Sequence, residues 1–273
     1  MNESQKPPPQ DTESLASQTD TGRAAETLPP PRMMRVPLPA LAPTATYVIL
    51  GFTVAVYLLQ LLSVAVAGYA VGEVDWLMLF GARINESILE GQLWRLITPV
   101  FLHGSPAHIF FNMYALFSIG AFLERQFGHG RFLLLYFLGA LSGNVFSFLL
   151  TGGGFSVWAS TAVFGLVAGE AIFFHQNRGL FGGFAQRAIG NAVFIIAVNL
   201  FIGLSPGIDN WGHVGGLLGG AIFAWFAGPR WQVTGIAPDL KLEDERETRE
   251  VLIGVGTVVA LFGFLAVLKI FGN

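Results

Sequence analysis

Residues 209–220 read Asp-Asn-Trp-Gly-His-Val-Gly-Gly-Leu-Leu-Gly-Gly, and this stretch opens a long apolar segment. At helical spacing, His213 shares one face with Gly216, Gly220 and Ala224. A stripe of small residues lets the backbone of a second helix approach closely, which is a common way for helices to pack in membranes. The stretch therefore predicts a tightly packed membrane helix that begins with a buried histidine.

The composition also indicates a membrane protein. Of the 273 residues, 53% are hydrophobic and 12% are charged, whereas a soluble domain has about 25% charged residues. A spanning helix needs roughly 20 apolar residues, so the length allows about six to eight spans. The net charge of -3 offers no basic surface for nucleic acid. The sequence contains no cysteine, which excludes disulfides and thiolate chemistry.

Seven apolar segments predict an all-α polytopic membrane protein. They occupy residues 44–71, 107–124, 131–151, 160–175, 188–204, 211–228 and 250–271. Residues 72–105 mix charges with tryptophans and are predicted to form an interfacial loop. We divide the chain into a Pro-rich tail predicted to be disordered, a six-span core, a linker and a seventh helix, at residues 1–40, 41–228, 229–249 and 250–273.

The lysines and arginines predict the orientation. With a cytoplasmic N-terminus, every Lys and Arg except Arg83, Arg95 and Lys269 falls on the cytoplasmic side, as the positive-inside rule expects. An odd number of spans then leaves the C-terminus outside. We expect a multi-pass protein of the lipid bilayer, in the cell (plasma) membrane.

Polar side chains at membrane depth are costly, so the few that occur are candidates for function. They are His108, Asn112, Glu124, Asn144, Ser160, Glu170, Asn191, Asn199 and His213. The predicted spans contain no aspartate, which excludes a paired-aspartate intramembrane protease. The chain has no His-Glu-x-x-His zinc motif and no Gly-x-x-x-x-Gly-Lys phosphate loop. We therefore expect neither a metal nor another cofactor.

Four of these residues, His108, Asn112, Ser160 and His213, fall in the outer parts of their predicted helices. Taken alone, His108 and Asn112 would be typical hydrogen-bonding groups between helices, and Ser160 would be a helix N-cap. Close packing of the small-residue faces would bring the Ser160 hydroxyl near the His213 imidazole, as a base-activated nucleophile requires. Separate donors for a developing oxyanion would complete the groups that acyl transfer uses.

Two glutamates have simpler interpretations. Glu124 precedes Arg125 at a cytoplasmic helix end and is predicted to be a structural hydrogen-bond acceptor. Glu170, near the inner end of the fourth span, is predicted to pair with His175 or to reach the interface. A proton relay through Glu170 in a transporter is the alternative.

The sequence resembles the rhomboid family of intramembrane serine proteases over nearly all of residues 41–228. Five motifs occur in family order: Gly91-Gln92-Leu93-Trp94-Arg95, His108-x-x-x-Asn112, Glu124-Arg125-x-Phe127-Gly128-x-Gly130-Arg131, Ser160 before Ala162-Val163-Phe164-Gly165-Leu166, and Asp209-Asn210-Trp211-x-His213-x-Gly215-Gly216. The seventh helix is similar to the added helix of the family's six-plus-one layout.

The resemblance implies a serine endopeptidase with Ser160 as the nucleophile and His213 as the general base, a dyad without a buried acid. The Ser160 backbone N–H, His108 and Asn112 would stabilise the oxyanion. The substrates would be single-span membrane proteins, cut near the outer end of the span. No oligomeric state follows from the sequence.

One motif departs from the family pattern. The family's serine usually lies in Gly-x-Ser-Gly, whereas this chain has Trp158-Ala159-Ser160-Thr161. A catalytically silent rhomboid-like protein that binds membrane clients is therefore the first alternative, with Trp158 as the disabling change. A transporter is the second.

Overall fold

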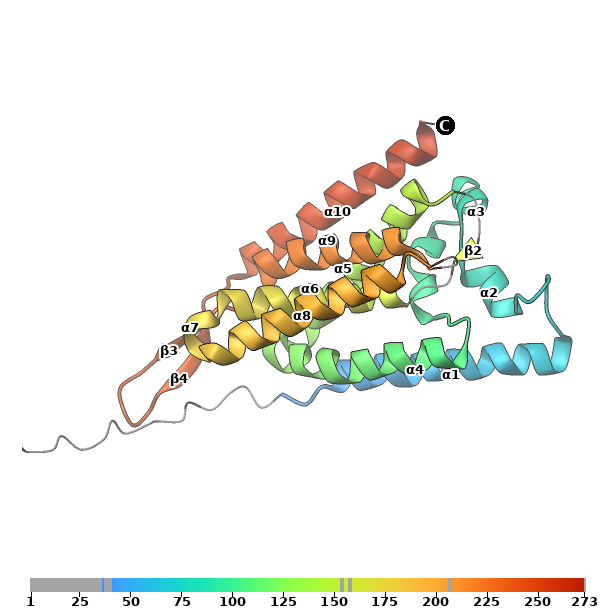
Figure 1. The fold of residues 1–273 in the computed structure, drawn as a ribbon. Coiled ribbons are helices and arrows are strands. Elements are labelled where there is room, and N and C mark those ends of the chain that lie inside the picture. Colours follow the sequence, from blue (N-terminus) through green and yellow to red (C-terminus); the bar gives the residue numbers. More distant parts are fainter. Residues whose placement is uncertain (1–35, 37–40, 153–154, 157–158, 206–207, 273) are drawn as a thin grey trace, which may run out of the picture. The chain divides into compact units, whose positions relative to one another are not determined.

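The computed structural model describes residue 36 and residues 41–152, 155–156, 159–205 and 208–272. Most of the tail predicted at residues 1–40, together with Trp158, lies outside these described residues. The fold is mostly helical (Figure 1). Its α-helices are α1 (Thr44–Ala67), α2 (Trp76–Gly81), α3 (Asn85–Leu89), α4 (Pro106–Ala115), α5 (Ala121–Leu150), α6 (Ser160–Gln176), α7 (Arg178–Phe181), α8 (Gly183–Ile202), α9 (Asn210–Ala227) and α10 (Thr248–Phe271).

Shorter elements complete the fold. Two 3-10 helices, η1 (Leu93–Leu96) and η2 (Thr98–Phe101), lie between α3 and α4, and a π-helical turn, η3 (Leu116–Gly120), joins α4 to α5. Two antiparallel pairs of strands are present: β1 (Arg83–Ile84) with β2 (Phe155–Ser156), and β3 (Trp231–Thr234) with β4 (Lys241–Asp244). The fold class is thus confirmed as mostly helical, and the short strands are an addition to the predicted all-α class.

Four helical segments among the described residues are long and apolar enough to cross a membrane. They are Thr44–Ala67, Pro106–Leu150, Gly183–Ile202 and Thr248–Phe271. The second of them has 45 residues and kinks at Gly128, whose φ of 76° and ψ of 162° are not helical. Glycine adopts such a conformation without steric strain. Two of the predicted apolar segments, 107–124 and 131–151, therefore meet at this kink.

The helices α6 and α9 are not among those four segments. They have 17 and 18 residues, and both pack against α5 and against each other. Both helices are short and rich in glycine and alanine, which add little hydrophobicity per residue. Length and composition alone thus establish several spans but not the predicted seven.

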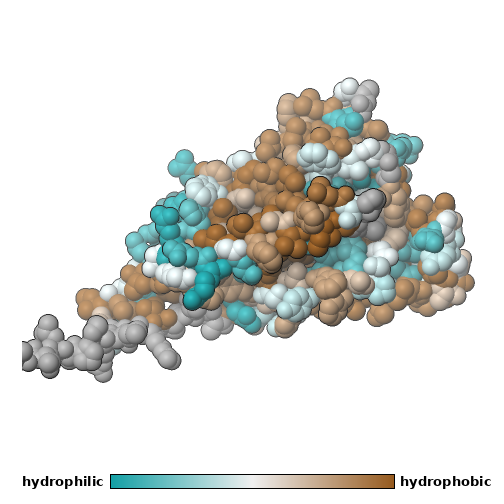
Figure 2. All heavy atoms as spheres, in the orientation of Figure 1, coloured by the Kyte–Doolittle hydropathy of each residue, from teal (hydrophilic) through white to brown (hydrophobic). Residues whose placement is uncertain are grey.

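The outward faces of α1, α8 and α10 are apolar. Their exposed large side chains include Val48, Phe52, Leu58 and Leu62 on α1, Val193, Phe194 and Phe201 on α8, and Leu252, Phe264, Val267 and Leu268 on α10. Hydrophobic residues cover much of the face seen in Figure 2. Apolar surfaces this extensive are rare in soluble monomers, so these faces suit contact with lipid chains.

Glycines hold the three central helices α5, α6 and α9 in contact. A Cβ atom built on Gly165 of α6 would lie 3.0 Å from the Cα of Gly139 in α5. A Cβ atom on Gly220 of α9 would lie 2.5 Å from the Cα of Gly165, and one on Gly216 would overlap the carbonyl of Thr161. No larger residue fits at these positions. The close packing of the small-residue stripe, which the sequence predicts, is therefore confirmed.

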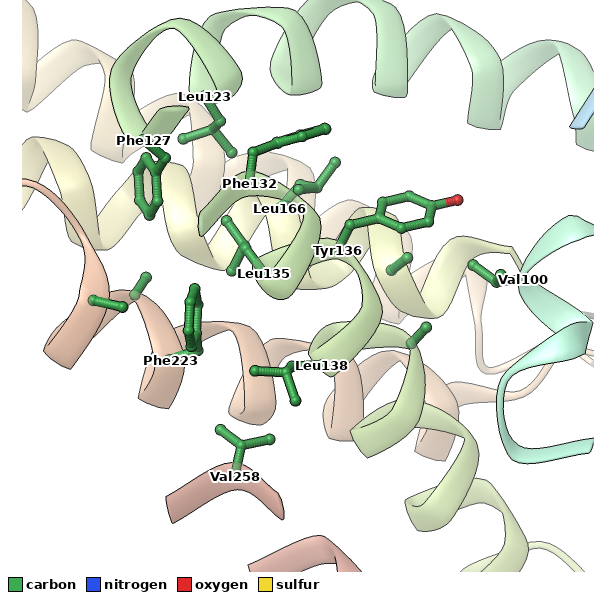
Figure 3. Close-up of a cluster of buried hydrophobic side chains, with 14 of the residues drawn as sticks. Val100, Leu123, Phe127, Phe132, Leu135, Tyr136, Leu138, Leu166, Phe223 and Val258 are labelled. Carbon is green, nitrogen blue, oxygen red and sulfur yellow. The ribbon is translucent and has the colours of Figure 1, made fainter. Parts of the chain in front are cut away.

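Buried apolar side chains fill the space around this contact. Phe223 of α9 and Val258 of α10 lie close to Leu138 of α5 (Figure 3), and all three belong to one buried cluster. Lipid chains are as apolar as these side chains, so the gain here comes mainly from van der Waals packing. The helix α10 is thus part of the packed core with α5 and α9.

Glu124 connects the first turn of α5 to the start of α1. Its buried carboxylate accepts hydrogen bonds from the backbone N–H groups of Ala45 and Thr46, both at 2.7 Å, and from the Thr46 hydroxyl at 2.6 Å. It also contacts His129. No described side chain of α1 caps its own N-terminus, so Glu124 satisfies N–H groups that a helix start leaves unpaired. The predicted structural role of Glu124 is confirmed.

Asp209 anchors the start of α9. Its carboxylate caps the helix by accepting from the Gly212 N–H at 3.0 Å, and Arg83 lies 3.9 Å away. It also accepts from the hydroxyls of Ser147, Thr151 and Ser156. Burial lowers the pKa of Arg83, although Asp209 and Glu86 oppose that shift. This cluster ties the loop after α1, the end of α5 and the strand β2 to the beginning of α9.

The predicted linker at residues 229–249 contains the β3–β4 hairpin. Asp244 accepts from the guanidinium of Arg131 in α5 at 2.6 Å, and Arg246 donates to the Gly228 carbonyl at the end of α9 at 2.9 Å. The hairpin is therefore fixed to the ends of α5 and α9 that lie away from Asp209.

We predict that Gly220→Ala destabilises the protein while Gly256→Ala does not. The new Cβ at position 220 meets the backbone of Gly165, which cannot rotate away, whereas nothing lies within 4 Å of a Cβ at position 256 of α10. Overpacking of this kind costs about 1–3 kcal/mol. The midpoint of thermal unfolding in detergent should fall for Gly220→Ala and stay equal or rise for Gly256→Ala. Equal midpoints would show that the glycine contact is not needed.

We also predict that Asp209→Ala is among the more destabilising single changes, because it removes a helix cap and leaves the Arg83 guanidinium buried beside no carboxylate. Breaking a buried pair in this way costs about 3–5 kcal/mol. The double variant Asp209→Ala with Arg83→Met should recover part of that loss in the same unfolding measurement. Additive losses in the double variant would mean that the two residues do not act together.

Candidate active site

The loop between α1 and α4 is held in shape by a buried arginine. Arg95 donates to the carbonyls of Ala82 at 2.7 Å and Leu79 at 2.9 Å, at the end of α2, and to the Gln92 side chain at 2.8 Å. Burial lowers the pKa of Arg95. The amide of Asn144 in α5 donates to the Leu96 carbonyl at 3.1 Å. The Gln-Leu-Trp-Arg motif therefore organises the loop and fixes it to α5.

Ser160 and His213 meet where α6 and α9 begin. The Ser160 Oγ lies 2.8 Å from the His213 Nε2, which is hydrogen-bond distance. Ser160 is the first residue of α6, and His213 is the fourth residue of α9. The serine and histidine that the sequence singles out are thus brought together across the glycine contact between the two helices.

Phe164 and the backbone orient the histidine. The Phe164 ring stacks on the imidazole with centroids 4.1 Å apart and planes 13° from parallel. The His213 N–H of the main chain donates to the Asp209 carbonyl at 3.3 Å. Within the described part of the chain, the buried Nδ1 of His213 has no hydrogen-bond partner. The arrangement is therefore a pair of groups, with no carboxylate bonded to the imidazole among those residues.

The start of α6 supplies further donors. Ser160 follows Ala159, and no side chain in the described residues caps this helix. The first N–H groups of a helix have no partner within it, and the helix dipole makes this end favourable for negative charge. The backbone around Ser160 is therefore suited to stabilise an anion beside the hydroxyl.

Asn112 and Ser160 line the same cavity, of about 560 Å³, between α4, α6 and α8. The buried Nδ2 of Asn112 has no hydrogen-bond partner among the residues that the structure describes. A buried amide without an acceptor is costly, so this group is available to a bound molecule. Asn112 thus lies in the cavity that Ser160 also lines, where a donor could reach an oxyanion.

His108 has a different set of neighbours. Its main-chain N–H donates to the Ser105 hydroxyl at 3.2 Å, which caps α4. Its ring lies 4.9 Å from the ring of His103, and its Nδ1 accepts from the Gly104 N–H at 3.5 Å. His108 is not among the described residues that line the cavity. The structure thus brings Ser160, His213 and Asn112 into one site, and His108 lies close enough to His213 to interact with it electrostatically.

Two contributors to the site lie within the quoted motifs, but the sequence analysis gives them no role of their own. Phe164 follows Ser160 by four positions, so its shared helical face was a usable signal. Asp209 precedes His213 by four positions, and its residue type before an apolar run is typical of an N-cap. No spacing in the sequence indicates the ion pair between Asp209 and Arg83. Among the described residues, no group of three or more His, Asp or Glu side chains is arranged to hold a metal ion.

Comparison with known proteins points to one family. The Rhomboid domain matches residues 90–230, which is more than half of the chain. The chain is 42% identical over 148 residues to Rhomboid protease GluP of Bacillus subtilis (strain 168), covering 54% of this chain and 28% of that protein.

Two relatives from Toxoplasma gondii have similar sequence identities to this chain. Rhomboid-like protease 3 is 36% identical over 145 residues, covering 53% of this chain and 55% of the relative. Rhomboid-like protease 1 is 38% identical over 151 residues, covering 52% and 49%. The chain thus spans from about a quarter to just over half of the length of these curated relatives.

The matched region contains both partners of the Ser160–His213 hydrogen bond and the three helices whose glycines bring them together. Several of the helices are long and apolar enough to cross a membrane. The chain is a multi-pass integral membrane protein that belongs to the rhomboid family.

Proposed function

We propose that this protein is an intramembrane serine endopeptidase in which Ser160 is the nucleophile and His213 is the general base. The observation that carries the proposal is the 2.8 Å separation of Ser160 Oγ and His213 Nε2. A serine hydroxyl is a weak nucleophile unless a base accepts its proton. The names of the relatives, which are rhomboid proteases, agree with this chemistry.

The chemical steps follow from this geometry. His213 Nε2 accepts the Ser160 proton as Oγ bonds to the carbonyl carbon of the substrate. The imidazolium then gives that proton to the leaving amine, so the peptide bond breaks and an acyl ester remains on Ser160. A water molecule, deprotonated by His213, attacks the ester; the bond to Ser160 Oγ breaks, the imidazolium returns the proton to Oγ, and the second product leaves as a carboxylic acid. Stacking on Phe164 keeps the imidazole in one orientation throughout.

Asn112 and the start of α6 would stabilise the oxyanion, with His108 as a further donor. Asn112 carries an amide without an acceptor among the described residues, and it lines the cavity that holds Ser160. The Ser160 backbone N–H lies at the positive end of the α6 dipole. His108 lies in the first turn of the same helix as Asn112 and interacts electrostatically with His213.

We further propose the six-plus-one layout, in the cell membrane, with a cytoplasmic N-terminus and the active site towards the outside. Arg131 and Arg246 gather around the hairpin, at the ends of α5 and α9 opposite to the site. Two of the three exceptions to the positive-inside pattern, Arg83 and Arg95, are buried and bonded within the protein. They therefore do not act as surface charges of an outer loop. Single-span membrane proteins would be the substrates.

The competing proposal is a silent relative that binds membrane clients without cutting them. Its sequence argument rests on Trp158, which lies outside the described residues. Thr161, the other departure from the family pattern, is buried against Gly143 and Gly212. It therefore fills a helix contact and leaves the nucleophile accessible to the cavity. No described residue of the site specifically supports the hypothesis of a transporter.

We predict that Ser160→Ala abolishes cleavage of a single-span test substrate in lipid vesicles, because it removes the hydroxyl that is hydrogen-bonded to His213. Product should fall by at least about 10³-fold, to the background of empty vesicles. His213→Ala should do the same. The protease proposal would be refuted if Ser160→Ala formed as much product as the wild type, or if neither protein formed any product.

We predict that Asn112→Ala lowers kcat by about 10²–10³-fold while KM changes little, as expected for a donor that acts on the oxyanion. Gln232→Ala, on the exposed strand β3 and outside the cavity, is the control for loss of an amide. Initial rates over a range of substrate densities in the membrane separate kcat from KM. A change in KM alone would assign Asn112 to substrate binding instead.

A further inference from the structure

The cavity that contains Ser160 extends along α6 to a carboxylate. Its lining on α6 is Ser160, Val163, Phe164, Val167 and Glu170, a spacing that keeps all five on one helical face. Glu170 is ten residues beyond Ser160, which is about 15 Å along the helix axis. The cavity therefore presents the nucleophile near one end and an acidic group towards the other.

Glu170 has no partner within the part of the chain that the structure describes, since no hydrogen bond or ion pair involves it. The histidine expected to pair with it, His175, instead lies against the Trp225 ring with centroids 6.2 Å apart and planes 26° from parallel. A carboxyl group in apolar surroundings is costly unless a donor satisfies it. The side chain therefore has an unfilled need for a hydrogen-bond donor, and it lies on the cavity wall.

Amides on α8 line the opposite side. Asn191 and Asn199 both line the cavity, on a helix whose other surface residues are largely apolar. The short helix α7 connects α6 to α8, so the two helices run in opposite directions (Figure 1). Asn191 is then nearer to the level of Glu170, and Asn199 is nearer to that of Ser160. Asn199 donates to the Ile195 carbonyl of its own helix at 2.8 Å, which leaves its amide oxygen as an acceptor.

We propose that Glu170, with Asn191, forms a subsite that recognises a hydrogen-bond-donating side chain, an amine or an amide, within the membrane segment of the substrate. The proposal rests on the proposed protease function and adds a specificity determinant to it. The lining residues that the structure describes include one carboxylate and no Lys or Arg. The complementary group on a substrate is therefore a donor, such as the side chain of Lys, Asn or Gln.

The length of the cavity fixes where the donor should lie. An extended substrate covers about 15 Å in roughly four to five residues, and a helical one covers it in roughly ten. The donor should therefore lie between about four and ten residues from the cleaved bond. A donor next to that bond, or well beyond this window, should have no effect.

The test uses the full chain in lipid vesicles and a single-span substrate whose segment is all Leu and Ala apart from its cleavage site. One Lys or one Gln replaces Leu at each position from one to fourteen residues from the cut. For the wild type, we expect kcat/KM to be at least tenfold higher with the donor at one or two positions inside the window. Glu170→Leu should remove that peak for both donors. Glu170→Gln, which is nearly isosteric, should remove it for Lys and retain it for Gln.

Glu243→Gln is the matched control, because it makes the same chemical change on the exposed hairpin and should leave the profile unaltered. The reversed pair, Glu170→Lys with a single Glu in the substrate, should restore a peak at the same position. A flat profile for the wild type, with cleavage that still requires Ser160, would overturn the subsite and leave the protease intact.

Binding provides a second measurement that does not depend on turnover. The Ser160→Ala protein, with and without Glu170→Leu, is crosslinked to the same substrate series. Donor-dependent capture that is lost in Glu170→Leu supports the subsite even if no substrate is cleaved, and in that case the protease proposal alone fails. Capture that is independent of the donor overturns the subsite.

Discussion

The direct contact between the backbones of α6 and α9 is the constraint on which the site depends. Gly165 and Gly220 leave no room for a side chain between the two helices, so the helix axes must lie close together. Ser160 and His213 begin those helices, and the short distance between their side chains follows from the helix contact. In lipid, such a contact is stabilised by van der Waals packing and polar bonds, since apolar burial alone gains little there.

The glycines that permit this close contact lower the stability of the helices, and polar bonds at the helix ends offset that loss. Each glycine inside a helix is less favourable than alanine by about 1 kcal/mol, and α9 contains several. Asp209 at one end of α9 bonds to α5 and β2 and caps α9 itself, and Asp244 in the hairpin at the other end bonds to Arg131 of α5. These polar anchors fix the direction of α9, and thereby the height at which His213 faces Ser160. Phe164 then selects the orientation of the ring.

Sequence pattern predicts the parts of this arrangement that depend on local spacing. The small-residue stripe after His213 predicts the packed face of α9, and Glu124 is correctly predicted to be structural. The Arg83–Asp209 pair joins residues far apart in the chain, and only the folded backbone brings them together. The β3 strand, from Trp231 to Thr234, alternates apolar and polar residues, so the hairpin carried a strand signal that the prediction of a linker did not use. The burial of Arg95 was unpredictable, because its acceptors are backbone carbonyls, which carry no sequence signal.

The two glutamates in the helical core have different roles: one stabilises the fold, and the other is proposed to bind the substrate. Glu124 accepts from two backbone N–H groups and a hydroxyl, so its carboxylate is satisfied by the fold itself. Glu170 is the same residue type in similarly apolar surroundings, but it lines a cavity and no described residue satisfies it. The cavity that Glu170 lines also holds Ser160, so a substrate segment bound there can supply the donor that the fold does not.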